Sequence, residues 1–336
     1  SFRLLDDENK YMDWIYTALK IKTYSAATQA GYIFGIQMDK PNHGYYVGTY
    51  EVGEFYFSNE VGLTITRSFP LEYCSRGCIT HSKIFLLGLT SLEDKGRHYL
   101  VKLNWGTEIF VEWKKYVPAA VMSIFLLDNI LYLGLKDGTL QIWDIEKEDC
   151  IENIKLFDLS IDYINLTYKN IIVGSSNGEI TYLKKNGKVI WRKELSQAMI
   201  MGIMEREDAI IIIDEKGNYY RLNVETGDLL LKGILGLKEV KDPSVSSNLV
   251  SIRDWFVISG NAVIWVFWNS DYSLVYYHVA DDPLKRVLYS NLSDLYMGDD
   301  DGCIQLWQFG FKIESFSEEA KKKLEEQPGF YDFELL

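Results

Sequence analysis

The residues that could bind a metal ion are few and widely separated in this sequence. Cys74 and Cys78 form a Cys-x3-Cys pair, but no second cysteine or histidine pair follows at the spacing of a zinc finger. The other candidates are scattered along the chain: Cys150, Cys303, His43, His81, His98 and His278. We therefore predict free thiols and no metal site.

Acidic residues that could bind calcium or act as acid and base occur side by side. Asp299, Asp300 and Asp301 are consecutive, whereas a calcium loop needs alternating acids whose side chains converge on one ion. Asp281 and Asp282 are adjacent and would point to opposite sides of an extended strand. The sequence also has no G-x-S-x-G, phosphate-binding loop or dinucleotide-binding glycine pattern. It predicts neither an enzyme nor a bound cofactor.

The elements that must position these residues are β-hairpins of an internal repeat. The stretch "ILYLGLKDGTLQIWDI" has two apolar runs joined by a Lys-Asp-Gly turn at Gly138, and glycines accept the positive φ of such turns. Segments on Gly178, Gly217 and Gly302 match it, and the first three glycines recur at intervals of about 40 residues. Apolar residues on both sides of these strands indicate sheets that are covered on both faces.

Extending the interval gives the remaining units of the repeat. Backward extension reaches Gly96 and then Gly53 as further hairpin turns. For the interval between Gly217 and Gly302, the turn falls either at Gly260 or near Asp271. We favour Asp271, because "AVIWVFW" and "SLVYYHV" form the better strand pair, and "LKEVKDPSVSSN" is then a surface insertion. The sequence predicts an all-β, seven-bladed β-propeller of four-stranded antiparallel blades.

The composition agrees with this fold and excludes some partners. Hydrophobic residues make up 47% and aromatic residues 14%, with 23 tyrosines and 9 tryptophans, as expected for a strand-rich globular protein. The net charge of −13 repels phosphate backbones and anionic membrane surfaces. No window of about 18 apolar residues occurs, and the acidic start does not resemble a signal peptide. We expect a cytoplasmic protein that binds neither nucleic acid nor membrane.

The repeat resembles known propeller families. "GTLQIWDIEKEDCIENIKLFD", with Trp143 and Asp144, is similar to the third and fourth strands of a WD40 blade. "GEITYLKKNGKVIWRKEL" and "GNYYRLNVETGDLLLKGIL" are more similar to quinoprotein-type or assembly-factor propeller blades. The resemblance covers roughly residues 30–316 and implies the propeller fold without a specific activity. Since no Gly-His dipeptide opens a blade and the Trp-Asp pair occurs once at this position, we expect the blades to rely on apolar packing.

The two ends of the chain have separate roles in this interpretation. A strand within residues 11–24 is expected to close the last blade, so that residues 1–316 form the propeller. Residues 317–336 are expected to form a short C-terminal helix, capped by Ser315 or Ser317 and ended by Pro328 and Gly329, followed by an acidic and aromatic tail.

The predicted function is a non-catalytic scaffold for protein–protein interactions. Loops that enter the blades on one propeller face would bind a protein or peptide of basic character, with candidate contacts at Arg76, Tyr116, Asp162 and Gln197. We expect a monomeric propeller within a complex. Two alternatives remain: a structural subunit docked by its C-terminal tail, and a small-molecule-binding, sugar-binding or enzymatic propeller that uses the central pore. Trp265 and Trp268 in "AVIWVFW", on opposite faces of a strand, would then supply an aromatic sugar-binding platform.

Overall fold

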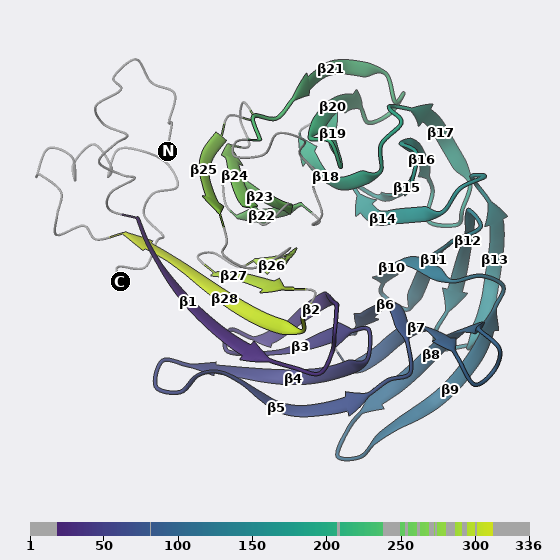
Figure 1. Ribbon diagram of the computed structural model, residues 1–336. Coiled ribbons are helices and arrows are strands. Elements are labelled where there is room, and N and C mark those ends of the chain that lie inside the picture. Colours follow the sequence, from purple (N-terminus) through teal and green to yellow (C-terminus); the bar gives the residue numbers. More distant parts are fainter. Residues whose placement is uncertain are drawn as a thin grey trace, which may run out of the picture.

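The computed structural model shows a ring of strands built around a central axis (Figure 1). It describes residues 19–311 apart from a set of short gaps, at 81, 207–208, 238–248, 253–254, 261–262, 269–271, 273, 280–285, 291–293 and 300. The predicted C-terminal helix and the predicted insertion "LKEVKDPSVSSN" fall almost wholly outside the described residues.

The strands of the first four blades follow one another in chain order. Blade 1 contains β2 (Ile33–Lys40), β3 (His43–Gly48), β4 (Glu51–Ser58) and β5 (Gly62–Pro70). Blade 2 contains β6 (Cys74–Ile79), β7 (Ile84–Ser91), β8 (Arg97–Trp105) and β9 (Ile109–Val117). Blade 3 contains β10 (Val121–Leu127), β11 (Ile130–Leu135), β12 (Thr139–Asp144) and β13 (Asp149–Lys155). Blade 4 contains β14 (Ile161–Thr167), β15 (Asn170–Ser175), β16 (Glu179–Leu183) and β17 (Val189–Glu194).

The last three blades have the same plan, except that blade 7 takes one strand from the start of the chain. Blade 5 contains β18 (Ile200–Arg206), β19 (Ala209–Asp214), β20 (Asn218–Asn223) and β21 (Leu229–Ile234). Blade 6 contains β22 (Val250–Ile252), β23 (Trp255–Gly260), β24 (Val263–Trp268) and β25 (Leu274–Val279). Blade 7 contains β26 (Arg286–Ser290), β27 (Asp294–Gly298), β28 (Cys303–Phe311) and β1 (Leu19–Ala27).

The seven sheets of the described chain confirm the predicted fold class. Each has four strands, and neighbouring strands pair antiparallel throughout, as in the order β10-β11-β12-β13. The innermost strand of each blade lies near the centre of the ring and the outermost strand lies at its rim (Figure 1). This is an all-β propeller.

The hairpin turns between second and third strands correct two expectations. Gly96, Gly138, Gly178, Gly217 and Gly302 all have positive φ and lie at these turns. The glycine predicted for blade 1 does not, because Gly53 lies inside β4 and the turn falls at residues 49–50. A Cβ atom at Gly53 would lie 2.5 Å from the ring of Tyr46. Glycine is therefore needed at this position for close packing against Tyr46, and not to form a turn.

For blade 6, the prediction that the turn between the second and third strands lies near Asp271 is wrong. Gly260 pairs with Val263 in the β23–β24 hairpin, so the turn follows Gly260. The strands chosen from the sequence do pair with each other, but they are β24 and β25, the third and fourth strands of the blade. Strand patterns alone cannot distinguish these two kinds of hairpin, since both join apolar strands.

Blade 7 is completed by the N-terminal strand. β1 pairs antiparallel with β28 over its whole length, from Leu19 opposite Phe311 to Ala27 opposite Cys303. The two strands lie side by side in Figure 1. Pairing of this kind closes the ring and leaves β1 as the outermost strand of blade 7.

The core lies between neighbouring blades. In one cluster, Ile172 and Tyr182 of blade 4 pack with Ile212 and Tyr220 of blade 5, and all four side chains are buried. Trp265 is fully buried in a corresponding cluster between blades 5 and 6, so it cannot serve as an open platform for a sugar. Stacking each sheet between two others explains why both faces of the strands are apolar.

Polar side chains support the turns more than the sequence led us to expect. The carboxylate of Asp214, which is fully buried, accepts hydrogen bonds from the backbone N–H groups of Lys216 and Asn218 at 3.0 and 2.9 Å. Asp299 accepts equivalent bonds from Asp301 and Cys303 at 3.0 and 2.8 Å. The consecutive acids of blade 7 thus include a turn cap, and the blades do not rely on apolar packing alone.

Candidate functional site

The ring has two faces with different connections. Because strands alternate in direction within a blade, one face carries the links between blades and the turns between second and third strands. We call this the loop face. The opposite face carries the turns between first and second strands and those between third and fourth strands, and we call it the turn face.

The structure places the four residues predicted to bind a partner toward the loop face. Arg76 is near the start of the innermost strand of blade 2, where it donates a hydrogen bond to the backbone oxygen of Ser75 at 2.7 Å. Its guanidinium carbon lies 5.8 Å from the centre of the Phe34 ring, in blade 1. Burial lowers the pKa of Arg76, and the charge of Asp162 acts in the opposite direction.

Asp162 occupies the equivalent region of blade 4 and interacts electrostatically with Arg76. Its Oδ2 accepts a hydrogen bond from the hydroxyl of Ser160 at 2.7 Å. Burial raises the pKa of Asp162, while the Ser160 hydrogen bond and the charge of Arg76 act to lower it. Two of the four predicted residues are therefore close enough to influence each other across the ring centre.

The other two predicted residues lie apart from this pair. Tyr116 is on β9, the outermost strand of blade 2, three strands from Arg76 on β6, which corresponds to about 14 Å at ordinary strand spacing. Its side chain is 62% exposed and its ring contacts Tyr99. Gln197 lies in the loop before β18 and donates a hydrogen bond to Glu194 at 2.9 Å. The four residues do not form one compact site.

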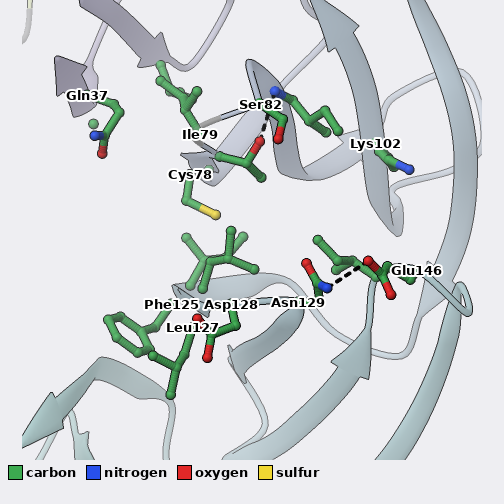
Figure 2. Close-up of a pocket in the computed structure, with 18 of the residues that line it drawn as sticks. Gln37, Cys78, Ile79, Ser82, Lys102, Phe125, Leu127, Asp128, Asn129 and Glu146 are labelled. Atoms are coloured by element: carbon green, nitrogen blue, oxygen red, sulfur yellow. Dashed lines mark hydrogen bonds between the residues drawn. The ribbon is translucent and has the colours of Figure 1, made fainter. Parts of the chain in front are cut away.

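A pocket opens instead toward the turn face, between blades 1, 2 and 3. Its volume is about 900 Å³. We call it the turn-face pocket. Its wall is made of apolar side chains from innermost strands, including Ile36, Ile79, Ile124, Phe125 and Leu127. Figure 2 shows Cys78 on β6 directed toward β10, where Ile124 and Leu126 pack with it, whereas Phe125 and Leu127 of β10 point away from Cys78.

Glycines on the innermost strands allow the blades to approach one another beside this pocket. At Gly77, an added Cβ atom would lie 2.7 Å from Leu87 and 2.8 Å from Val47, which belong to the second strands of blades 2 and 1. Gly35, on β2, also borders the pocket. With no side chains at these two positions, the wall consists of the longer apolar residues around them.

The rim of the turn-face pocket is polar and carries both signs of charge. Asn129 donates a hydrogen bond to the carboxylate of Glu146 at 2.7 Å, drawn as a dashed line in Figure 2. Asp128 lies beside Asn129 in the turn between β10 and β11, where it has a φ of 53° and is exposed. On the wall of blade 2, Lys102 forms a salt bridge with Glu112 at 3.1 Å, and its side chain is only 13% exposed. The acidic groups at the mouth are the more accessible ones.

Cys78 is the one cysteine that lines the pocket. Burial raises the pKa of its thiol to about 12, so the thiol stays protonated at neutral pH. A protonated thiol is a weak nucleophile and a weak metal ligand. Elsewhere in the part of the chain that the structure describes, no group of three or more histidine, cysteine or acidic side chains is arranged to hold a metal ion.

Sequence reasoning missed the turn-face pocket because it placed the site in the loops that enter the blades. The signal was present in β10, "VMSIFLL", where Ile124, Phe125, Leu126 and Leu127 are consecutive and apolar. All four are only partly buried, although both faces of an innermost strand are directed toward neighbouring blades and only one edge is directed toward the ring centre. Four consecutive apolar residues at the end of an innermost strand indicate that the ring centre is apolar at that end.

Comparison with known proteins supports the fold and does not extend to function. No protein-family model and no curated protein matches the sequence. The WD40 β-propeller domain of Doa1 superposes with a TM-score of 0.68 over 90% of this chain and 99% of that domain, at 13% identity. The computationally designed Ika8 protein superposes with a TM-score of 0.64 over 85% of this chain and 98% of its own, also at 13% identity. Within its described residues, the chain has no helix long and apolar enough to cross a membrane. The chain has the fold of WD40-type β-propellers.

Proposed function

We propose that this protein is a non-catalytic interaction scaffold that binds a peptide segment of a protein partner in the turn-face pocket. The observation that carries the proposal is the pocket itself, which has an apolar wall of innermost-strand residues and a polar rim. Pockets with this combination bind apolar groups and orient them by a few polar contacts. A volume of about 900 Å³ is large enough for one or two apolar side chains of a bound segment.

The charges at the rim indicate the character of the partner. Asp128 and Glu146 are exposed at the mouth, and the whole chain carries a net charge of −13. Lys102, the cation in the wall, is already paired with Glu112. The favoured segment therefore has an apolar residue next to a lysine or arginine, since opposite charges across an interface add specificity and speed association.

The chemistry of the pocket argues for binding rather than catalysis. Cys78 has a raised thiol pKa, which makes it a poor nucleophile. The amine of Lys102 is already engaged in a salt bridge with Glu112 at 3.1 Å. A wall of this kind supplies shape and desolvation but no activated group.

A random peptide library displayed on phage tests this proposal. Selection against the whole chain should enrich sequences with an apolar residue beside a basic one, and fluorescence polarisation should then give the affinity of a synthetic peptide. Leu127→Glu should weaken binding at least tenfold, because it puts a charge into the apolar wall. The matched control is Leu230→Glu, a change at a leucine that is 51% exposed on β21 and far from the pocket; it should leave the affinity unchanged.

The loop face provides the competing outcome. A variant with alanine at Arg76, Tyr116, Asp162 and Gln197 should retain peptide affinity if the turn-face pocket is the site. Loss of binding in that variant, with normal binding by Leu127→Glu, would move recognition to the loop face and retain the scaffold role. If no peptide is enriched by the whole chain, the scaffold proposal fails.

A further inference from the structure

Two arginines of blade 5 point toward blade 6 without a counter-charge among the described residues. Arg221 on β20 is paired across the sheet with Ile211, which in turn is paired with Met204. Met204 and Ile211 pack against Trp265 and Phe267 of blade 6, so this row of side chains faces that blade. Arg206 is two residues beyond Met204 on β18 and therefore lies on the same face.

Each guanidinium has a buried nitrogen with no hydrogen-bond partner. These atoms are Nη2 of Arg206 and Nε of Arg221. Neither arginine takes part in a salt bridge within the described part of the chain. Buried donors are nearly always paired, whereas these two are not, although each arginine as a whole is only partly buried. Two such groups on one face of one blade call for an explanation.

Two tyrosines complete the surroundings of these arginines. Tyr219, on the same strand as Arg221, has its ring 4.6 Å from that of Tyr272, which lies in the connection between β24 and β25 of blade 6. Burial raises the pKa of Tyr272, and the positive charges of Arg206 and Arg221 act to lower it. Both guanidinium groups are thus near the same phenol at the junction of blades 5 and 6.

We propose that this junction binds a phosphate-type oxyanion, held by the guanidinium groups of Arg206 and Arg221 with phenol donors from Tyr219 and Tyr272. Guanidinium groups present several N–H donors in a fixed plane and favour bidentate contacts with phosphate or carboxylate oxygens. A single carboxylate satisfies only one such fork. A dianion with more acceptor oxygens matches two arginines and two hydroxyl groups better. The junction is separate from the turn-face pocket, and its proposed role does not depend on the peptide-binding function.

Isothermal titration calorimetry with inorganic phosphate tests the proposal on the whole chain at pH 7.4. Sodium chloride at the same ionic strength serves as the reference, because a general salt effect does not saturate at one site. We expect saturable binding at one site, and an Arg206→Met, Arg221→Met double variant should bind phosphate at least tenfold more weakly. Arg97→Met is the matched control, since Arg97 is 64% exposed and paired with Asp94; its affinity should equal that of the unchanged protein.

Two further measurements separate loss of the site from loss of the fold. Without phosphate, the double methionine variant should have a thermal midpoint equal to or above that of the unchanged protein, because two partly buried cations, each with an unpaired buried nitrogen, are removed. An Arg206→Lys, Arg221→Lys variant keeps the charges but not the planar forks, and it should bind phosphate with intermediate affinity.

Phenyl phosphate distinguishes the source of the anion. Binding at least tenfold tighter than that of inorganic phosphate would indicate a phosphate carried on an organic molecule, and equal binding would indicate the free ion; both support the site. The absence of saturable phosphate binding, or equal affinity in the unchanged protein and the double methionine variant, would overturn the proposal.

Discussion

The hydroxyl of Thr28 donates a hydrogen bond to the backbone oxygen of Gly302 at 2.6 Å, although the two residues are 274 positions apart in the chain. The backbone N–H of Thr28 donates to the same oxygen at 2.8 Å. These bonds lie at the end of the β1–β28 pairing, where the first strand of the described chain meets the last. Thr28 therefore joins the two ends of the ring at the loop face.

Replacing Thr28 with valine should weaken this closure. The hydroxyl also accepts a hydrogen bond from the backbone N–H of Ala30 at 3.0 Å, so the substitution removes two hydrogen bonds with little change in shape. We expect a loss of about 1–2 kcal/mol in the free energy of unfolding, measured by urea denaturation. Thr23→Val, at an exposed position of the preceding strand β1, should change stability by less than about 0.5 kcal/mol. Equal effects of the two changes would contradict a special role for Thr28.

Two turn glycines should differ in their tolerance of alanine. Gly138 and Gly96 have similar φ values, 84° and 77°. At Gly138 a Cβ atom would overlap the backbone oxygens of Phe157 and Leu159, whereas at Gly96 nothing lies within 4 Å. Gly96→Ala should therefore cost only the conformational penalty, about 1–2 kcal/mol, and Gly138→Ala should cost about 3 kcal/mol or more. Urea denaturation of both variants checks this, and equal losses would show that backbone strain alone determines the cost.

The fold could be predicted from the sequence because the repeat records it locally. Positive-φ glycines such as Gly138 and Gly178 lie at five of the turns between second and third strands, and their spacing gives the length of a blade. The same reasoning failed at Gly53, where a glycine is needed for packing against Tyr46 rather than for a turn. A glycine in sequence does not reveal which of these two requirements it meets.

The candidate site was harder to predict, since it depends on which strand ends meet at the ring centre. Arg76 and Asp162 were chosen from loops, and the structure brings these two into electrostatic interaction but leaves Tyr116 at the rim. The turn-face pocket combines side chains of three blades whose residues are up to about 110 positions apart. Only the register of each blade and the closure of the ring determine that Ile36 and Phe125 border the same space.

Cys78 should react slowly with alkylating reagents in the folded protein. Its thiol pKa is raised to about 12, so the thiolate that reacts is scarce at pH 8. We expect alkylation of Cys78 by iodoacetamide to be at least about a hundredfold slower than in urea, as measured by mass spectrometry of the peptide that contains it. Between pH 7 and pH 10 the rate should rise about tenfold per unit, because the thiolate fraction does so below the pKa. A rate that levels off near pH 9, the ordinary pKa of a thiol, would show that the thiol is not desolvated.

The carboxyl groups of Asp162 and Asp228 should give stability changes of opposite sign with pH. Burial raises the pKa of Asp162 above its ordinary value of 3.8 in the folded state. Its ionisation therefore opposes folding, so the stability of the unchanged protein relative to Asp162→Asn is greatest below pH 3.8 and declines as the pH rises through the folded-state pKa. Hydrogen bonds from Thr226 and Lys193 lower the pKa of Asp228, so the stability relative to Asp228→Asn is present above pH 3.8 and is lost as the pH falls through the folded-state pKa.

Urea denaturation of the unchanged protein and both variants between pH 3 and pH 7 measures these differences directly. Taking each difference at the same pH cancels the titration of all other groups, provided that they do not interact with the substituted residue. For Asp162, that provision fails at Arg76, whose charge favours the ionised carboxylate. The stability of the protein with Asp162 relative to Asp162→Asn should therefore decline more with rising pH when both proteins carry Arg76→Met than when both retain Arg76. If the decline is the same in both backgrounds, the electrostatic link between Arg76 and Asp162 across the ring centre is negligible.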